Sequence, residues 1–416
     1  MTSSLRLATT LLCTVLSCSA AGPAFAVVTG ARDSKSTMIR DDDLFPRPAA
    51  VRKQVRFWRK IFYEYPSTTV VVHDAFDPDR VVELIDYSPS EKKSKNSFTV
   101  PRKDRDEVTT RNLKQYLSAA EHFAKEGEAA LQRGEAEKRL FEAYRSSPAA
   151  LQRLYKGEVK LRAQSGLADD FIFASKNAQV HLPIMEKIFL RYGVPTILTR
   201  LPFVESMFNL RARSKVGASG IWQFMPQTAR HYIFVNNLID ERNSPEKSTK
   251  AAAQFLANNY RMLGSWPLAI TAYNHGVVGM AKAVKKLGTK DIGSIVETYK
   301  SPSFGFASRS FYSEFLAAAD SYDRLYRQKK IPKADPSILT SSVILQHPIS
   351  VAQLVQNTTL SKENLASLNP CLLDTALSAG FQRPLPAFYE IKVPKRQAKA
   401  IKLGIRTFQA KRYARR

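Results

Sequence analysis

Apolar side chains that recur every three or four residues are the strongest constraint on how this 416-residue chain can fold. Such spacing places the apolar side chains on one face of an α-helix. The pattern runs through residues 113–178, with charged stretches between the apolar positions, and returns at 182–189, 249–262 and 311–326. It predicts a mainly α-helical protein.

Changes in composition divide the chain into segments. Residues 27–112 combine an apolar helix and a β-type strand with a linker rich in Lys, Ser and Asp, and residues 113–180 form a helical extension. A compact helical block covers 181–334, a small α+β unit with two short helices between extended ends covers 337–395, and a basic tail covers 396–416. At 44% hydrophobic content, the chain can bury the cores of two or three domains.

Residues 1–26 have the features of a signal peptide. The apolar run at 7–16 is too short to span a bilayer, and Ala-Phe-Ala at 24–26 has the small-x-small form of a signal-peptidase site. A second interpretation stays open, since Val-Leu-Ser-Cys at 15–18 resembles a lipobox, in which Cys18 would carry lipid and associate the protein with the outer membrane. Both interpretations predict an exported protein of the cell envelope, either periplasmic or associated with the outer membrane.

The chain is strongly basic, with 63 Lys and Arg against 37 Asp and Glu and a formal charge of +26. Such a charge attracts polyanions, which include nucleic acid, anionic lipid and acidic wall polymers. Part of the charge lies in residues 392–416, which hold ten basic residues and no acidic residue. The predicted leader and the lack of a basic and aromatic binding motif argue against nucleic acid as a partner.

Motifs for metal and cofactor chemistry are absent from the sequence. It has no H-E-x-x-H, no pair of C-x-x-C motifs and no Walker-type glycine loop, and its six His residues are scattered. Gly-Ala-Ser-Gly at 217–220 lacks the G-x-S-x-G spacing of a hydrolase nucleophile. We therefore predict neither a metal nor a cofactor. Cys371 has no partner once the leader cysteines are removed, so we also predict no disulfide framework.

Glu205 is the acidic residue whose neighbours point to chemistry. Apolar residues flank it at 202–204 and 207–208, and such surroundings disfavour the charged carboxylate and raise its pKa. A general acid that works near neutral pH needs a pKa raised in this way. The flanks alone leave a structural role open, because an acid in the first turn of a helix is also stabilised by the helix dipole.

Two motifs place Glu205 in a wider pattern. The first is E-S-x-F at 205–208 followed by A-x-S-x-x-G-A-x-G-I-W-Q at 212–223, and the second is A-Y-N-H-G at 272–276. Together they closely resemble the signature of the family 1 lytic transglycosylases, whose SLT catalytic domain is similar to goose-type lysozyme. The flanking L-P-F-V-E and G-I-W-Q-F resemble the membrane-bound lytic transglycosylase D subgroup. The resemblance implies a goose-type-lysozyme-like helical catalytic domain over residues 181–334, with 113–180 as a helical extension.

The resemblance also implies an enzyme that cuts the glycan strands of peptidoglycan with a single carboxylate. Glu205 would protonate the bond between N-acetylmuramic acid and N-acetylglucosamine. It would then take a proton from the C6 hydroxyl, so that a 1,6-anhydro sugar forms. A goose-type-lysozyme-like hydrolase with the same fold and acid is one alternative, and a non-catalytic wall-binding protein is another.

Further positions in the motifs are expected to bind substrate. These are Ser206, Ser214, Gly217, Gln223, Tyr273, Asn274 and Tyr312. Helix capping or loop hydrogen bonds are an alternative role for the two serines, and Trp222 is as consistent with the core as with a sugar platform. Family members carry a late tyrosine opposite the catalytic acid. The spacing puts Phe311 at that position with Tyr312 beside it, so the choice between them stays open.

The unit at 337–395 resembles a degenerate LysM module, with an L-x-x-L-N pattern at 365–369. Such modules bind N-acetylglucosamine chains, and a unit that only packs against the rest of the protein would have the same pattern. Because both motifs end before residue 336, we expect glycan cleavage to survive removal of everything after residue 334. Binding to whole walls should then weaken.

Overall fold

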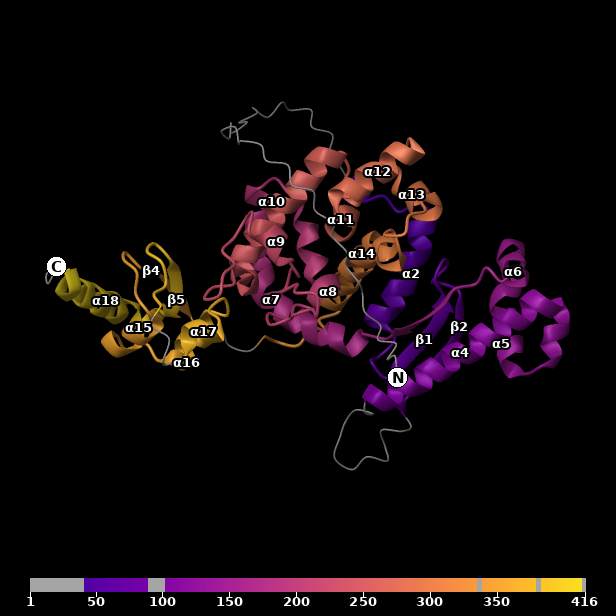
Figure 1. Ribbon diagram of the computed structural model, residues 1–416, viewed down its shortest axis with the longest axis horizontal. Coiled ribbons are helices and arrows are strands. Elements are labelled where there is room, and N and C mark those ends of the chain that lie inside the picture. Colours follow the sequence, from indigo (N-terminus) through magenta and orange to yellow (C-terminus); the bar gives the residue numbers. More distant parts are fainter. Residues whose placement is uncertain (1–40, 89–101, 335–338, 379–382, 414–416) are drawn as a thin grey trace. The chain divides into compact units, whose positions relative to one another are not determined.

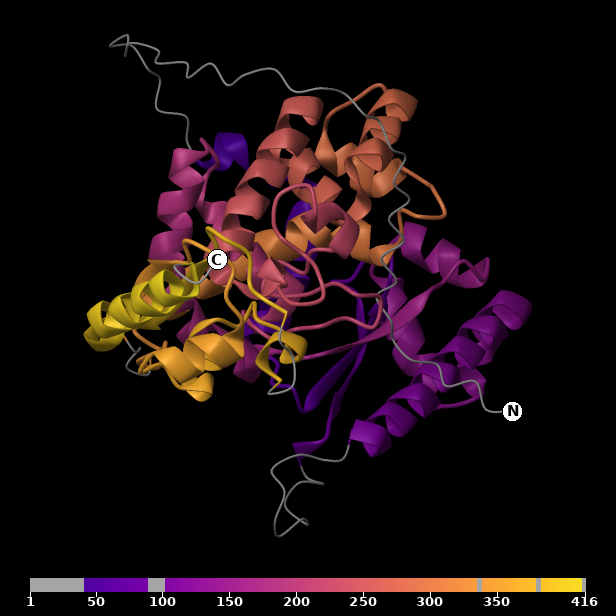
Figure 2. The same cartoon turned by 60° about the vertical axis from the view of Figure 1, so that its left-hand side comes forward.

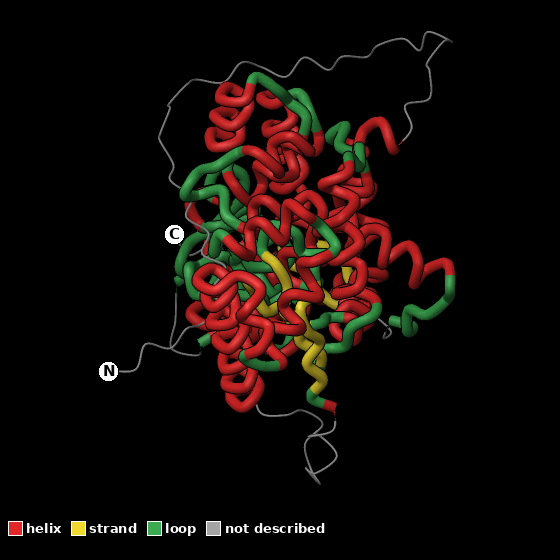
Figure 3. Tube along the Cα trace, turned by 90° about the vertical axis from the view of Figure 1, so that its right-hand side faces the viewer, coloured by secondary structure: helices red, strands yellow, loops and turns green. Residues whose placement is uncertain are grey.

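The computed structural model describes residues 41–88, 102–334, 339–378 and 383–413. The predicted leader, with Cys18 and the cleavage site at 24–26, lies outside these residues. Helices dominate the described chain and the strands are few (Figures 1 and 3), so the predicted mainly α-helical fold is confirmed. None of these described helices has both the length and the apolar content that a bilayer crossing requires.

The chain divides into two compact units. The first contains the chain up to Ala168 together with Leu256–Ala317, and the second contains Asp169–Phe255 together with Ala318–Arg416. Each unit therefore joins segments that are distant in the sequence.

A three-stranded antiparallel sheet lies in the first unit. Its strands, in spatial order, are β2 (Val81–Asp86), β1 (Thr69–Asp74) and β3 (Leu161–Ser165). The central strand β1 is buried along its whole length. Its valine run predicts a strand because β-branched side chains pack well in the interior of a sheet.

The helices of the first unit form separate cores with this sheet. The bounds of the helices are α1 (Asp41–Leu44), α2 (Ala49–Tyr63), α4 (Arg102–Glu126), η1 (Gly127–Gln132), α5 (Glu135–Arg145), α6 (Pro148–Tyr155), α11 (Trp266–His275), α12 (Val277–Leu287) and α13 (Ile292–Thr298). Helices α4, α5 and α6 share a core around Phe123, Leu140 and Tyr144, while α2 packs against α13. Helix α4 begins inside the predicted linker because Val108 packs against Tyr87 and its neighbours in the sheet.

The second unit begins with the long helix α7 (Ala168–Arg191), which continues through Pro183. The elements after it are η2 (Thr196–Arg200), α8 (Leu201–Ser206), α9 (Pro226–Ala229), η3 (Glu241–Asn243) and α10 (Pro245–Leu263). Helix α10 passes into the first unit at Leu256, and α14 (Phe306–Arg327) returns to the second unit at Ala318. Phe171 of α7 stacks on Phe203 at 4.5 Å between ring centroids, and Phe189 stacks on Trp222 at 5.6 Å. These contacts hold α8 and the loop that follows it against α7.

Residues 339–378 and 383–413 of the second unit form a small α+β arrangement that we call the C-terminal module. Its elements are β4 (Thr340–Ile344), α15 (Val351–Asn357), α16 (Lys362–Leu368), α17 (Asp374–Leu377), β5 (Glu390–Pro394), η4 (Lys395–Gln397) and α18 (Ala398–Tyr413). Strands β4 and β5 pair antiparallel, with Val343 opposite Ile391. The sequence predicts two helices between extended ends, and the structure has α15 and α16 there together with a third, four-residue helix, α17.

The basic end of the chain differs from the solvated tail that its charge predicts. Residues 398–413 form α18, which lies along the other elements of the C-terminal module (Figures 1 and 2). Ile401 and Ile405, one turn apart, are buried in the core of the module, and Phe408 packs beside them. This apolar stripe makes the basic segment an amphipathic helix, because its cations occupy the opposite face.

Candidate active site

Glu205 lies in the last turn of α8, next to an unusual helix end. The following residues, Met207 and Phe208, both have φ of 50°, in the left-handed region that non-glycine residues rarely adopt. Phe208 is fully buried and packs edge-on against Phe203 with ring centroids 4.6 Å apart. This packing stabilises a backbone conformation that costs roughly 1 kcal/mol or more per residue, as is common at functional sites.

The environment of the Glu205 carboxyl favours its protonated form. The residue is partly exposed, yet burial of its carboxyl raises the pKa to about 8. Desolvation is the sole cause of this shift; no charge or hydrogen bond from the described residues contributes to it. The pKa shift predicted from the apolar flanks is confirmed. At neutral pH this group can donate a proton.

The loop after α8, residues 209–224, carries most of the first motif, and we call it the motif loop. Ser206 Oγ donates to Ile221 O at 2.9 Å, which ties the loop to the end of α8. Ser214 Oγ accepts from Ala218 N at 2.8 Å. Gln223 Nε2 donates to Gly220 O at 2.8 Å and to Ala212 O at 3.2 Å. The side chains of Ser206, Ser214 and Gln223, all predicted to bind substrate, therefore form hydrogen bonds with the backbone of the motif loop.

Two glycines of the motif loop have positive φ but different surroundings. Gly220 has φ of 76°, and a Cβ placed there would lie 1.8 Å from Arg242 O, so no larger residue fits. Gly217 has φ of 93° and is exposed, and a Cβ placed there would make only an ordinary van der Waals contact with Pro226 at 3.9 Å. Gly217 and the partly exposed Ser214 therefore form an accessible part of the loop.

Trp222 belongs to the core rather than to a sugar platform. Its ring is fully buried against Phe189, and its Nε1 donates to Thr249 Oγ1 at 2.9 Å. A buried indole with its donor satisfied anchors the motif loop to α7 and α10.

The second motif lies on α11, in the first unit. Tyr273 stacks on Phe311 with centroids 6.4 Å apart and ring planes 4° apart, and Asn274 Oδ1 accepts from Ser308 Oγ at 2.8 Å. Tyr312 is fully buried, and its hydroxyl donates to Pro46 O at 3.0 Å. Phe311, not Tyr312, is thus the late aromatic residue beside Tyr273. The meeting of these residues with Glu205 in one site remains a prediction from the motifs.

Sequence reasoning missed a buried polar cluster at 240–243. Asp240, Arg242 and Asn243 are all less than 8% exposed, and Arg242 and Asn243 bond to the motif loop. The run Asp-Glu-Arg-Asn shortly before α10 could have indicated this cluster. Adjacent charged side chains need hydrogen-bonding partners when they are buried. No group of three or more His, Cys, Asp or Glu side chains suited to a metal ion occurs within the described parts of the chain.

Residues 185–296 match the family model of the transglycosylase SLT domain. The chain contains a transglycosylase SLT domain. The matched stretch includes Glu205, the motif loop, the cluster at 240–243, Tyr273 and Asn274. The predicted family resemblance is therefore confirmed for this stretch.

Named relatives agree with the SLT domain. Over 190 residues the chain is 29% identical to membrane-bound lytic murein transglycosylase D of Escherichia coli (strain K12). The aligned residues make up 45% of this chain and 41% of that relative. The chain thus spans about two fifths of the length of this relative. Among solved structures, the 70 kDa soluble lytic transglycosylase of Escherichia coli is 17% identical, with 69% of this chain and 53% of that chain covered. Its TM-score of 0.31 is too low to establish a shared overall fold.

Proposed function

We propose that this SLT-domain protein is a lytic transglycosylase that cuts the glycan strands of peptidoglycan, with Glu205 as its single general acid and base. The observation that carries the proposal is the desolvated Glu205 carboxyl, with its pKa raised to about 8, inside the stretch that matches the SLT domain. Most glycosidases use two carboxylates. A single carboxyl can serve both steps if the sugar supplies the nucleophile.

The reaction needs two proton transfers at the same carboxyl. Protonated Glu205 gives its proton to the oxygen between N-acetylmuramic acid and N-acetylglucosamine, and the bond from that oxygen to C1 breaks. The substrate's own N-acetyl oxygen stabilises the positive charge at C1. The Glu205 carboxylate then takes the proton of the C6 hydroxyl, whose oxygen closes on C1. Glu205 is thereby protonated again, and no water is consumed.

Groups from both motifs are proposed to bind the saccharide. Ser214 and Gly217 lie on the accessible part of the motif loop, while Tyr273 and Asn274 are held by Phe311 and Ser308. Ser206 and Gln223 would act mainly by keeping the loop in shape, since their polar groups bond to loop carbonyls. We propose no direct contact for Tyr312, whose hydroxyl bonds to Pro46 O.

The products decide between this proposal and a hydrolase of the same fold. We expect digestion of purified peptidoglycan to release muropeptides about 18 Da lighter than the hydrolysed sugars, the mass of the water that is not added. Mass spectrometry of the released muropeptides measures this difference. Ordinary reducing sugars would support the goose-type-lysozyme-like alternative, and no release at all would support a non-catalytic wall-binding protein.

The C-terminal module is proposed to bind the same glycan strands. Its two short helices α15 and α16, which lie between paired strands and are followed by the four-residue α17, support the resemblance to a LysM module. The charge of +26 would add attraction to acidic wall polymers.

We also propose that the protein acts in the cell envelope, since the relative of similar sequence is named as membrane-bound. Protein from the native host should begin either after Ala26 or at a lipid-modified Cys18. Amino-terminal sequencing combined with intact mass distinguishes the two. A retained Met1 in a cytoplasmic fraction would contradict both.

A further inference from the structure

A short segment of the SLT domain completes the core of the C-terminal module. Residues 234–243, which we call the docking segment, contribute Leu238 and Ile239 to the buried cluster formed by the module. Ile239 pairs with Leu372 in an antiparallel bridge. On either side, Asp240 N donates to Cys371 O at 2.8 Å and Leu373 N donates to Leu238 O at 2.9 Å. The module is therefore bonded to the SLT domain through both backbone and core contacts.

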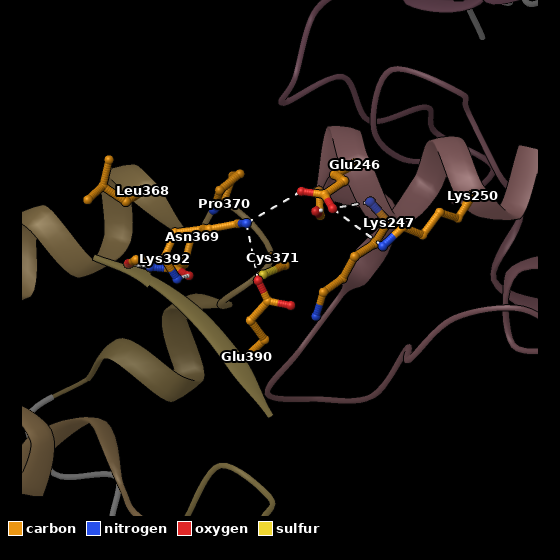
Figure 4. A pocket seen from close by; sticks show the side chains of 10 residues that line it. Glu246, Lys247, Lys250, Leu368, Asn369, Pro370, Cys371, Glu390 and Lys392 are labelled. Carbon is orange, nitrogen blue, oxygen red and sulfur yellow. Dashed lines mark hydrogen bonds and ion pairs between the residues drawn. The ribbon is translucent and has the colours of Figure 1, made fainter. Parts of the chain in front are cut away.

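The start of α10 extends this contact. Lys392 of the module lies 3.4 Å from the Glu246 carboxylate and 3.1 Å from Glu390, and the ammonium of Lys247 lies 4.3 Å from the centre of the Tyr389 ring. Figure 4 shows Glu246 and Lys247 from one side and Glu390 and Lys392 from the other around a small pocket. Because the charges that line it are paired with each other or, for Lys247, with Glu241, we interpret the pocket as part of the contact surface rather than as a ligand site.

The docking segment is bonded on its other side to the motif loop. Arg242 is 7% exposed, and its Nε and Nη2 donate to the two carboxylate oxygens of Asp240 at 2.8 and 2.7 Å. Its Nη1 donates to Gly217 O at 2.7 Å and to Phe224 O at 2.9 Å. One guanidinium thus joins the docking segment to both ends of the motif sequence 217–224.

Neighbouring contacts make this junction tight. Ser219 Oγ donates to Asn243 Oδ1 at 2.7 Å, and Gly220 lies so close to Arg242 O that a Cβ would not fit. The loop is in turn bonded to the end of α8 by Ser206. A continuous series of contacts therefore runs from Cys371 through Asp240, Arg242 and the motif loop to the helix of Glu205.

We propose that Arg242 is a positioning residue through which the docked C-terminal module holds the motif loop against the helix of Glu205. The module is then part of the catalytic scaffold, in contrast to the expectation that cleavage survives without residues beyond 334. A planar guanidinium with five donors suits this task, because it can serve a carboxylate and two carbonyls at once. This inference rests on the proposed function, since it explains how the catalytic carboxyl is kept in place.

The test is Arg242→Lys in the full chain. Lysine keeps the charge beside Asp240, but its single ammonium cannot replace all four hydrogen bonds, so the fold should persist while the loop loosens. We expect kcat on purified glycan strands to fall by about 10- to 100-fold, with a smaller change in KM, since small misplacements of reacting groups have effects of this size. The matched control is Arg230→Lys at an exposed position after α9, which should behave as wild type.

The pH profile separates positioning from general destabilisation. Among the described residues, burial alone raises the pKa of Glu205, so the alkaline limit of the kcat profile reports how well water is kept from this carboxyl. In Arg242→Lys the alkaline limit should move to lower pH. A variant with wild-type kcat and an unchanged alkaline limit would overturn the proposal.

A second variant tests the same connection from the side of the module. Ile239→Ala removes part of a fully buried side chain between the docking segment and the module. If both variants weaken one connection, their effects on kcat should be less than multiplicative in the double variant. Fully multiplicative effects would overturn the role of the module. If wild type makes anhydro sugars and both variants match it, only this inference fails; if wild type makes none, the proposed function fails first.

Discussion

Glu205→Gln is expected to reduce the release of muropeptides from peptidoglycan to background. The substitution keeps the size of the side chain but removes its transferable proton. One proton-transfer role is commonly worth about 10² to 10⁴ in rate, and here one group performs both transfers. Quantitative mass spectrometry of digested peptidoglycan measures the loss, while sedimentation with whole walls should show that wall binding persists.

Glu297→Gln is the matched control for this experiment. Glu297 is an exposed glutamate on α13 outside both motifs, so its variant should retain most of the activity. The sequence also recommends Glu241 as a control, but the structure argues against it. Glu241 is buried in the docking segment, where it accepts from Phe234 N at 2.9 Å and pairs with Lys247. Substantial activity in Glu205→Gln would reject the single-carboxylate mechanism.

Local patterns in the sequence were sufficient to predict much of the fold. The helical spacing over 182–189 corresponds to the end of α7, and the valine run corresponds to β1. The same reasoning missed α18, where Ile401 and Ile405 were outweighed by the surrounding charges. An amphipathic helix has both properties, so counting charge alone gives the wrong result.

Long-range contacts could not be predicted in this way. Leu238 and Ile239 are adjacent apolar residues in a loop, and nothing nearby in the sequence indicates that Leu372 is their partner. Such pairing depends on the tertiary arrangement, which hydrophobic periodicity does not contain. Our proposal for Arg242 therefore departs from the expectation that the catalytic block is complete before residue 336, and activity of a chain that ends after residue 334 would test that expectation.

The candidate site shows the same division. The apolar flanks of Glu205 predict a raised pKa, and burial of the carboxyl does raise the pKa. The roles of three other residues depend on what each one contacts. Trp222 packs on Phe189, Phe311 stacks on Tyr273, and the Tyr312 hydroxyl bonds to the backbone at Pro46. Motif position suggested that these residues matter, but only the packing distinguishes a core anchor from a group that lies beside Tyr273.

Glu205→Gln is also expected to stabilise the protein at alkaline pH. Burial raises the pKa of Glu205 from its ordinary value of 4.5 to about 8 in the folded state, so the folded state binds this proton more tightly than the unfolded chain does. The resulting stabilisation is complete below about pH 4.5 and is lost as pH rises through about 8, above which the wild type holds a desolvated carboxylate. Glutamine stays neutral throughout. Allowing for partial exposure, the free energy of unfolding of the variant should exceed that of wild type by about 2 to 4 kcal/mol above pH 8, and the two should agree near pH 4.

Thermal unfolding of both proteins from pH 4 to pH 9 measures this difference. The gap in melting temperature should open between pH 5 and 8, where the folded and unfolded states differ in protonation, and should stay constant above that range. Glu297→Gln, at an exposed position, should follow wild type at every pH. A constant gap at all pH values would point to a packing effect of the amide instead. No gap at any pH would mean that the Glu205 carboxyl is well solvated, and then the carboxyl would be ionised at neutral pH and unable to act first as an acid.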